Sequence, residues 1–414
     1  MLEKMKSAWR ITELRKKIIY TFGMLLLYRL LCCIPVPGVN IAAVSEAVKS
    51  FSVLDFMNMM TGGSFQNMTI MAMGITPYIN ASIILQLLTV AIPTLEKLAK
   101  EGPEGRKKIT EWTRYLTVAL AFIQAVGLVF AMRANSYGGI WYLVIGVSMA
   151  AGTSLAMWIG ERITENGIGN GISLLIMAGI VSNMFNWSRQ AVVGLIDGTV
   201  GIIAVLVVVL AFLVMIVAIT YVDMGERRIP VQYAKRMVGR KMYGGQSTHI
   251  PMKLNSTGVM PLIFGFAILQ FPATVFAFFP TSGINLWWQG FQSGVWYQVV
   301  LAVLIIAFTY FYTGITFNPA DISKNMQQNG GIIPGIRQGR ATTDYLARVS
   351  SRLTLFSALF LAVLATIPTI ITRLFGVSTP FAASSVLIAV SVGIETIRQI
   401  EAQMVMRHHK GFLG

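Results

Sequence analysis

Ten long apolar stretches run along the chain, and the polar segments between them hold most of the charged residues. Each stretch is close to the ~17–25 residues that a helix needs to cross about 30 Å of hydrocarbon. We therefore predict an all-α polytopic membrane protein with ten transmembrane helices. The predicted helices cover 17–36, 69–92, 113–132, 141–160, 171–187, 199–222, 257–279, 296–317, 353–372 and 379–397.

One segment between the first two stretches does not fit this pattern. Residues 51–60, FSVLDFMNMM, are apolar but too short to cross a bilayer, and TGGSF follows them. Such a segment is either a re-entrant half-helix at about 51–61, surrounded by protein or water, or an amphipathic helix on the outer surface. The residues alone leave both interpretations open.

The second stretch is unusually polar for a membrane helix. Pro77 is expected to cost a backbone hydrogen bond, and Asn80 is polar, so this helix should face other protein or water. Ile75, Ile79 and Ile83 recur every four residues and share one face, a pattern that packing alone explains. Further along, the glycine-rich segment 161–173 follows a helix rather than a strand, which favours a tight turn over a phosphate site.

Composition agrees with a membrane protein, and charge gives the topology. Of the 414 residues 55% are hydrophobic and 12% are charged, which excludes an ordinary soluble enzyme. The net charge is +16, and 28 of the 33 Lys and Arg residues fall on one side of the predicted bundle. That side is cytoplasmic by the positive-inside rule, so both termini should be cytoplasmic. The first apolar stretch is too long for a signal-peptide core and should remain as a transmembrane helix.

Two long cytoplasmic loops, 223–256 and 318–352, carry 12 of these cations. The pairs Gly-Gly at 330–331 and Pro-Gly at 334–335 predict turns that hold Arg337 and Arg340 out at a loop tip. Tyr233 and Tyr243 are interleaved with the cations of the first loop. Such basic protrusions suit an acidic protein or the phosphates of RNA.

The sequence contains no catalytic, metal-binding or nucleotide-binding pattern. Its three histidines, His249, His408 and His409, lie in cytoplasmic segments, and no phosphate-binding loop with Gly-Lys-Ser/Thr is present. We therefore expect no metal, no cofactor and no enzymatic activity. Arg29 is the one clear charge inside a predicted helix, and snorkelling or hydrogen bonds to a loop would both accommodate it.

Two functional classes remain open at this stage. One is a passive channel with an apolar gate, driven by a motor that docks from the cytoplasm. The alternative is a secondary transporter with broken helices. Ion-coupled transport normally needs titratable groups at the membrane midplane, so their shortage favours the channel.

Six segments together resemble the SecY family, the central subunits of the bacterial protein-translocation channel. They occur in the family's order and run along most of the chain: GITPYINASIILQLL (74–88), GERITENGIGNGIS (160–173), ERRIPVQYAKR (226–236), QSTHIPMKLN (246–255), FNPADISKNMQQNGG (317–331) and PGIRQGR (334–340). The resemblance implies two pseudo-symmetric five-helix halves, 1–190 and 191–414, that close like a clamshell around a pore. It also implies the cytoplasmic membrane of a bacterium as the location.

The resemblance assigns roles to particular residues. The pore ring would be Ile75, Ile79, Ile172, Ile176, Ile263 and Ile388. The plug, about 51–67, would include Phe56, Met57 and Met60, with Gly62 and Gly63 as its hinge. Asn80, Gln124 and Asn255 would hydrogen-bond to one another and hold a lateral gate shut. An apolar ring of this kind dewets and blocks ions, yet it fits around passing peptides of any sequence.

The same resemblance implies the partners. The ATPase SecA or a translating ribosome, including its RNA, would dock on Arg236, Arg240, Lys241, Arg337 and Arg340. SecE and SecG would be the membrane partners, and signal sequences and unfolded polypeptides would be the substrates, with lateral release of apolar segments into lipid. Gln338 departs from the family, since many relatives have proline there, and this change predicts a less rigid loop.

Overall fold

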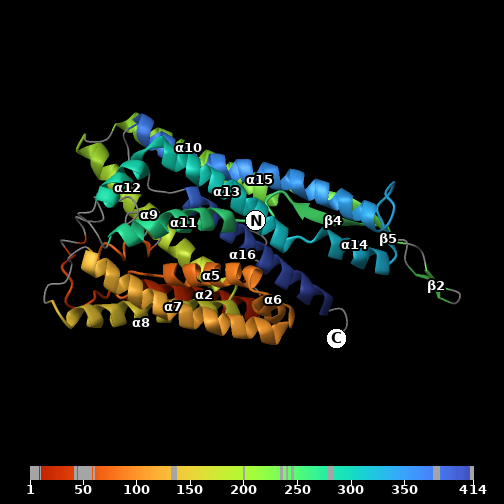
Figure 1. Cartoon of the computed structure of the whole chain (residues 1–414), viewed down its shortest axis with the longest axis horizontal. Coiled ribbons are helices and arrows are strands. Elements are labelled where there is room, and N and C mark those ends of the chain that lie inside the picture. The colour runs from red at the N-terminus through yellow and green to blue at the C-terminus, as the bar shows by residue number, and fades with distance from the viewer. Residues whose placement is uncertain are drawn as a thin grey trace.

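A computed structural model shows a bundle of long helices (Figure 1). It describes residues 11–41, 61–131, 138–198, 201–233, 236–238, 241–243, 247–277, 283–375 and 383–410, together with positions 9, 44 and 58. Ten of the described helices occupy the ten predicted segments. They are α2 (Thr12–Leu31), α5 (Thr76–Ala91), α7 (Pro103–Ala131), α8 (Trp141–Asn166), α9 (Gly171–Ile196), α10 (Ile202–Met224), α11 (Met260–Ala277), α13 (Val295–Thr316), α15 (Arg340–Phe375) and α16 (Ala383–Lys410).

Length and composition identify membrane-crossing helices among these. Within the described residues, six helices are long and apolar enough to cross a bilayer, and a bent pair brings the number to seven. The remaining three predicted segments are occupied by α2, α11 and α16. The chain is thus an all-α polytopic membrane protein, as its hydropathy predicts.

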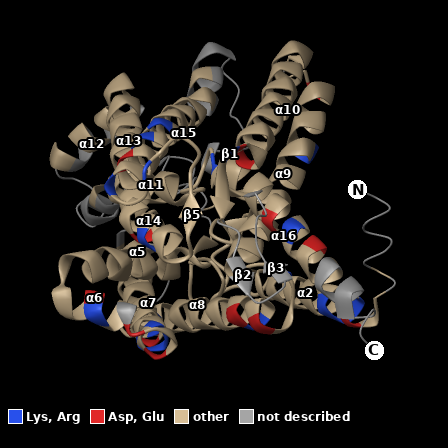
Figure 2. Ribbon diagram, turned by 90° about the vertical axis from the view of Figure 1, so that its right-hand side faces the viewer, with Lys and Arg blue, Asp and Glu red and all other residues tan. Residues whose placement is uncertain are grey.

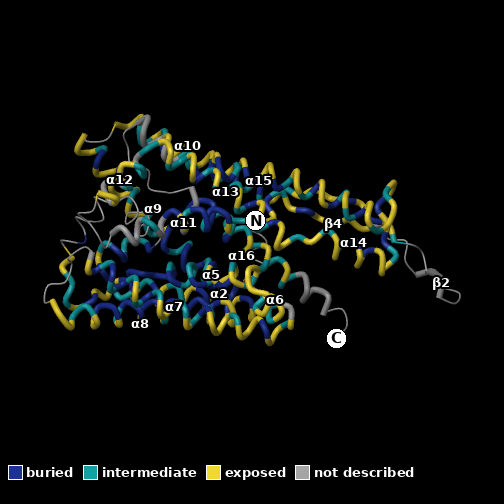
Figure 3. The backbone as a smooth tube through the Cα atoms, viewed as in Figure 1, coloured by how far each residue is buried: buried dark blue, intermediate teal, exposed yellow. Residues whose placement is uncertain are grey.

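The helices form two groups, and α9, α11 and α16 lie between them (Figure 1). In the N-terminal group α7 packs against α5 and α8, and in the C-terminal group α13 packs against α15 and also contacts α11. Each group has its own apolar core, one centred on Phe65 and Met149 and the other on Met215 and Leu361. A further core joins residues of α2, α5, α8 and α9 to α16, so apolar residues also connect the two groups. Figure 3 colours the backbone by burial and shows buried residues in the interior of the bundle.

The second predicted helix begins later than its hydropathy indicates. Residues 69–75 form turns that bond to the chain after α2, with Ile70 N donating to Ile34 O at 2.9 Å. Helix α5 begins only at Thr76, so Pro77 lies in its first turn, where a missing N–H costs nothing. The predicted loss of a hydrogen bond at Pro77 was therefore wrong. The 16-residue α5 is followed by α6 (Pro93–Lys100) after a bend of 107°.

The two long loops are folded, and they pack against each other. Strands β1 (Glu226–Tyr233), β4 (Ser247–Lys253) and β5 (Gly331–Ile332) form an antiparallel sheet in the order β4-β1-β5. Ile229 and Val231 of β1, Met326 of α14 (Pro319–Gln328) and Leu346 of α15 lie in one buried cluster, which we call the loop core. Strands β2 (Arg236–Val238) and β3 (Lys241–Tyr243) pair as a hairpin at the projecting end of the first loop (Figure 1).

The tyrosine prediction for the first loop needs a correction. Tyr233 is half-buried and packs on the loop core, so its ring stabilises the loop rather than facing a partner. The side chain of Tyr243 is outside the described part of the structure. On the opposite end of the bundle, α12 (Gly283–Ser293) lies between α11 and α13.

Candidate functional site

Six isoleucines predicted as a ring lie in a single apolar cluster, which we call the isoleucine cluster. Ile75, Ile176 and Ile388 are buried within it, and the other three are partly buried and pack against it. They come from the start of α5, from α9, from α11 and from α16. Residues that are up to 313 positions apart in the sequence are therefore brought together where the two helix groups meet.

The turn between α8 and α9 fixes the α9 side of this cluster. Gly169 adopts φ +85°, and the side chain of Asn170 accepts hydrogen bonds from the first N–H groups of α9. The turn is also tied to distant helices, because Ile168 N donates to Thr21 Oγ1 and Gly169 N donates to Gln399 Oε1, each at 3.0 Å. The tight turn predicted for 161–173 is confirmed, and it sets where Ile172 and Ile176 stand.

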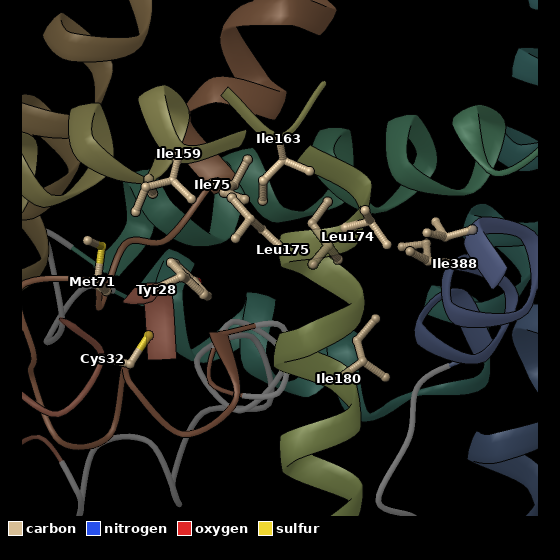
Figure 4. Packing of buried hydrophobic residues seen from close by; sticks show 13 residues of the cluster. Tyr28, Cys32, Met71, Ile75, Ile159, Ile163, Leu174, Leu175, Ile180 and Ile388 are labelled. Carbon is tan, nitrogen blue, oxygen red and sulfur yellow. The ribbon is translucent and has the colours of Figure 1, made fainter. Parts of the chain in front are cut away.

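The cluster is larger than the predicted ring (Figure 4). Additional buried members that sequence reasoning missed are Tyr28, Met71, Ile159, Ile163, Leu174, Leu175 and Ile180. Ile83, the third member of the isoleucine stripe, is also buried but is not part of this cluster. The stripe therefore divides between the cluster and another contact of α5, which a simple i, i+4 count could not show.

Of the predicted plug, only position 58 and the end, 61–67, fall within the described residues. Phe56, Met57 and Met60 lie outside them, whereas Gly62 and Gly63 adopt φ +66° and +88°. The turn that contains these glycines is closed by Gly63 N donating to Asn58 O at 3.0 Å. Beyond it Phe65 and Met68 are fully buried. We call residues 61–75 the outer segment; it leads directly into the isoleucine cluster through Met71 and Ile75.

The polar residues predicted for a lateral gate do not bond to one another within the described chain. Asn255 is buried, and its Nδ2 donates to Asp223 Oδ1 at 3.0 Å while its Oδ1 accepts from Ser357 Oγ at 3.1 Å. Asp223 also accepts a hydrogen bond from Ser391 Oγ. The expected bonds to Asn80 and Gln124 were wrong, because the C-terminal helices α10, α15 and α16 supply nearer partners.

Arg29 stands in the last turn of α2 and points inward rather than to a membrane surface. Its Nη2 donates to the backbone carbonyl of Ala178, inside α9 and 149 residues away in sequence. Of the two arrangements expected for this cation, hydrogen bonding within the protein is the one found. The contact joins two helices, and the outer segment lies against it.

The loop tip that carries Arg337 and Arg340 is exposed but rigidly held. Gln338 Nε2 donates to Gly331 O at 3.1 Å, Thr342 Oγ1 donates to Arg337 O at 2.8 Å, and Ser323 Oγ donates to Gly339 O at 2.9 Å. The less rigid loop predicted at Gln338 stays a prediction, and the side-chain amide of Gln338 gives the loop a hydrogen bond that a proline ring could not make.

Two of the other predicted docking cations, Arg236 and Lys241, lie on the β2–β3 hairpin. Arg236 pairs with Tyr243 and Val238 pairs with Lys241 across it, whereas Arg240 lies outside the described residues. Figure 2 views the molecule along the bundle and shows where charged residues fall on this end. Both loops project from the same end of the molecule (Figure 1).

Comparison with known proteins agrees with this architecture. A family model named SecY matches residues 69–397. Curated proteins named protein translocase subunit SecY are similar over their full length and over the full length of this chain, at 41% identity in Mycobacterium tuberculosis and Aquifex aeolicus and 43% in Streptomyces scabiei.

Solved structures give the same result for the fold. One described as a protein conducting channel matches 94% of this chain and 92% of its own, with a TM-score of 0.69 and 20% identity. Another, of canine Sec61 in a ribosome-channel complex, matches 94% of this chain and 92% of its own, with a TM-score of 0.65 and 19% identity. With a family model that matches most of its length and full-length relatives above 40% identity, this chain belongs to the SecY family.

Proposed function

We propose that this chain is the channel subunit of a protein translocase. It passes unfolded secretory polypeptides across a bacterial cytoplasmic membrane and releases apolar segments sideways into lipid. The observation that carries the proposal is the isoleucine cluster, in which aliphatic side chains from both helix groups converge. An apolar constriction excludes water and ions at rest, and its flexible side chains adapt to many peptide sequences.

The outer segment supports a seal on the outer side of this constriction. It follows directly on the proposed plug and brings Met71 into the same cluster as Ile75 and Ile388. The proposed lateral exit lies between α5 and α7 on one side and α11 and α13 on the other. A direct contact between α7 and α11 supports a closed exit in this arrangement.

The chain is not an enzyme, so energy for chain movement must come from a partner that docks at the cytoplasmic loops. We propose SecA or a ribosome with its RNA as that partner, and the exposed, rigidly held tip around Arg337 supports this choice. Exposed arginines of this kind bind the phosphates of RNA or an acidic protein surface. The backbone of the β2–β3 hairpin places Arg236 and Lys241 at the same end of the molecule.

Two smaller membrane subunits, SecE and SecG, complete the proposal. Helix α10 presents an exposed apolar face that either lipid or a partner helix must cover in a membrane. This face includes Ile203, Leu206, Leu210, Leu213, Val217 and Tyr221. The strong excess of cations on the loop side supports a location in the bacterial cytoplasmic membrane with both termini in the cytoplasm.

Crosslinking tests the channel directly. A photoreactive residue placed at Ile79 or Ile263 should crosslink to a secretory chain that is stalled during translocation. The matched control is Leu210, which is exposed on α10 away from the cluster. Labelling at Leu210 equal to that at Ile79 and Ile263 would remove the cluster as the translocation path.

Charge reversal tests the docking loop. Arg337→Glu should abolish SecA-driven translocation while membrane insertion of the chain remains normal. Arg348→Glu, an exposed arginine on α15 nearer the membrane, is the control and should translocate normally. Normal transport in the Arg337 variant would exclude this residue from docking. Cosedimentation with SecA or ribosomes at low and high salt adds a second readout, because a secondary transporter would show no salt-sensitive binding to either.

A further inference from the structure

Arg29 is a membrane-embedded cation for which the established chemistry of a channel gives no role. Among the described residues no carboxylate forms an ion pair with it, and its guanidinium donates to the carbonyl of Ala178. A helix-interior carbonyl has a second lone pair available, so it can accept from Arg29 without releasing its helical hydrogen bond. Charged side chains inside membrane segments are rare because they are costly, and they usually mark a functional position.

Gly62 of the outer segment lies directly on this guanidinium. A Cβ added to Gly62 would stand 2.5 Å from Arg29 Nη2, 2.8 Å from Arg29 Nη1 and 2.7 Å from the carbonyl of Gly179. The φ of +66° at Gly62 also favours glycine. Two independent constraints therefore require glycine here, and the first of them places the backbone of the outer segment against Arg29 and α9.

The same contact is connected to the isoleucine cluster. Tyr28, the residue before Arg29, is buried in that cluster together with Met71 of the outer segment. Hydrogen bonds hold the turn itself together, since Gln66 N donates to Asn58 Oδ1 at 2.9 Å and Thr61 Oγ1 donates to Asn58 O at 3.2 Å. The turn is therefore braced internally, and it meets the helices at Arg29 of α2 and at α9.

We propose that Arg29 is a positioning residue that seats the outer segment, by fixing the Gly62 turn between α2 and α9. This inference rests on the proposed channel function, in which the outer segment closes the apolar constriction from outside. The guanidinium packs directly against Gly62, and its hydrogen bond to Ala178 holds it there. It holds the segment in one place at rest and releases it when the turn lifts away, because the bond to Ala178 keeps Arg29 itself in position.

The experiment measures resting ion conductance of the reconstituted channel in planar bilayers. Arg29→Gln removes the positive charge and the two terminal guanidinium nitrogens, Nη1 and Nη2. It should raise resting conductance at least tenfold over the unaltered channel. Arg189→Gln, an exposed cation on α9, is the matched control and should leave conductance unchanged. Deleting residues 55–64 is the positive control, and that channel should leak.

A second variant separates seating from general stability. Gly62→Ala should also raise resting conductance. The double variant, Arg29→Gln with Gly62→Ala, should leak no more than the leakier of the two single variants, because both substitutions remove the same contact. Thermal unfolding of each variant in detergent is measured alongside, and the leak of Arg29→Gln should exceed that of any control variant with an equal loss of melting temperature.

The outcomes distinguish the inference from the function on which it rests. If the deletion leaks and Arg29→Gln does not, Arg29 has no seating role, although the seal stands. If the two substitutions multiply each other's effect on conductance, they act separately, and the proposed contact is wrong. If even the deletion fails to leak, the proposed seal itself is refuted.

Discussion

The hydrogen bonds of Asn255 allow one prediction to be worked out in detail. Asn255→Ala removes a donor from the Asp223 carboxylate and an acceptor from Ser357, both of which lose partners in a largely buried place. A hydrogen bond to a charged group contributes about 1.5–3 kcal/mol and one between neutral groups about 0.5–1.5 kcal/mol. We therefore expect Asn255→Ala to cost about 2–4 kcal/mol in the free energy of unfolding.

The loss can be converted into a melting temperature. An unfolding entropy of about 2.1 cal/mol/K per residue gives about 0.9 kcal/mol/K for the whole chain, so the expected decrease is about 2–5 °C. Differential scanning of the purified protein in mild detergent measures it. Asn80→Ala is the control, because Asn80 is half-buried on α5 and outside this network, and its effect should be small.

A double-mutant cycle identifies the partner. Asn255→Ala and Ser357→Ala should be coupled by about 0.6–1.7 kcal/mol, the range found for hydrogen bonds between membrane helices. Asn255→Ala and Asn80→Ala should be additive. Strong coupling to Asn80 together with none to Ser357 would refute the assignment of Asn255 to the C-terminal helices and restore the direct gate contact.

Two further substitutions test packing and the loop tip. Gly152→Ala should destabilise the protein by about 1–3 kcal/mol, because a Cβ there would overlap the carbonyl of Ile70. Gly23→Ala on α2 is the control: its Cβ would meet open space, so this change should be neutral or slightly stabilising. Equal melting temperatures for the two variants would contradict this reasoning. Gln338→Ala removes a hydrogen bond of about 1 kcal/mol that orders the loop around Arg337, so SecA-dependent translocation should decrease about fivefold when SecA is limiting. An unchanged dependence of translocation on SecA concentration would show that the amide of Gln338 does not position Arg337.

The helices could be predicted from the sequence because their signal is local. Each apolar run contains its own evidence, and α10, the most apolar of them, begins and ends within three residues of its predicted limits. The start of α5 was misplaced because 69–75 is as apolar as a helix but bonds to the chain after α2. Hydropathy does not distinguish these two ways of burying the same residues.

The loop sheet was missed although its sequence carries a signal. Ile229 and Val231 alternate with exposed neighbours in β1, the period of a half-buried strand, but the high charge of the loop concealed it. The partners of Asn255 carried no local signal at all. Ser357 is 102 residues from Asn255, and Ser391 is 168 residues from Asp223, so only the folded chain shows these contacts.

The loop core has a mechanical consequence. Helix α15 begins at Arg340, directly after the tip, and continues for 36 residues, or about 54 Å, into the bundle as one rod. Leu346 near its start is buried in the loop core with Ile229 and Val231 of the other loop. A force applied to either loop is therefore borne by the same rod. Pushing on the tip would tilt α15 or strain the loop core, so the proposed motor would act on a lever whose far end lies at the opposite end of the bundle (Figure 1).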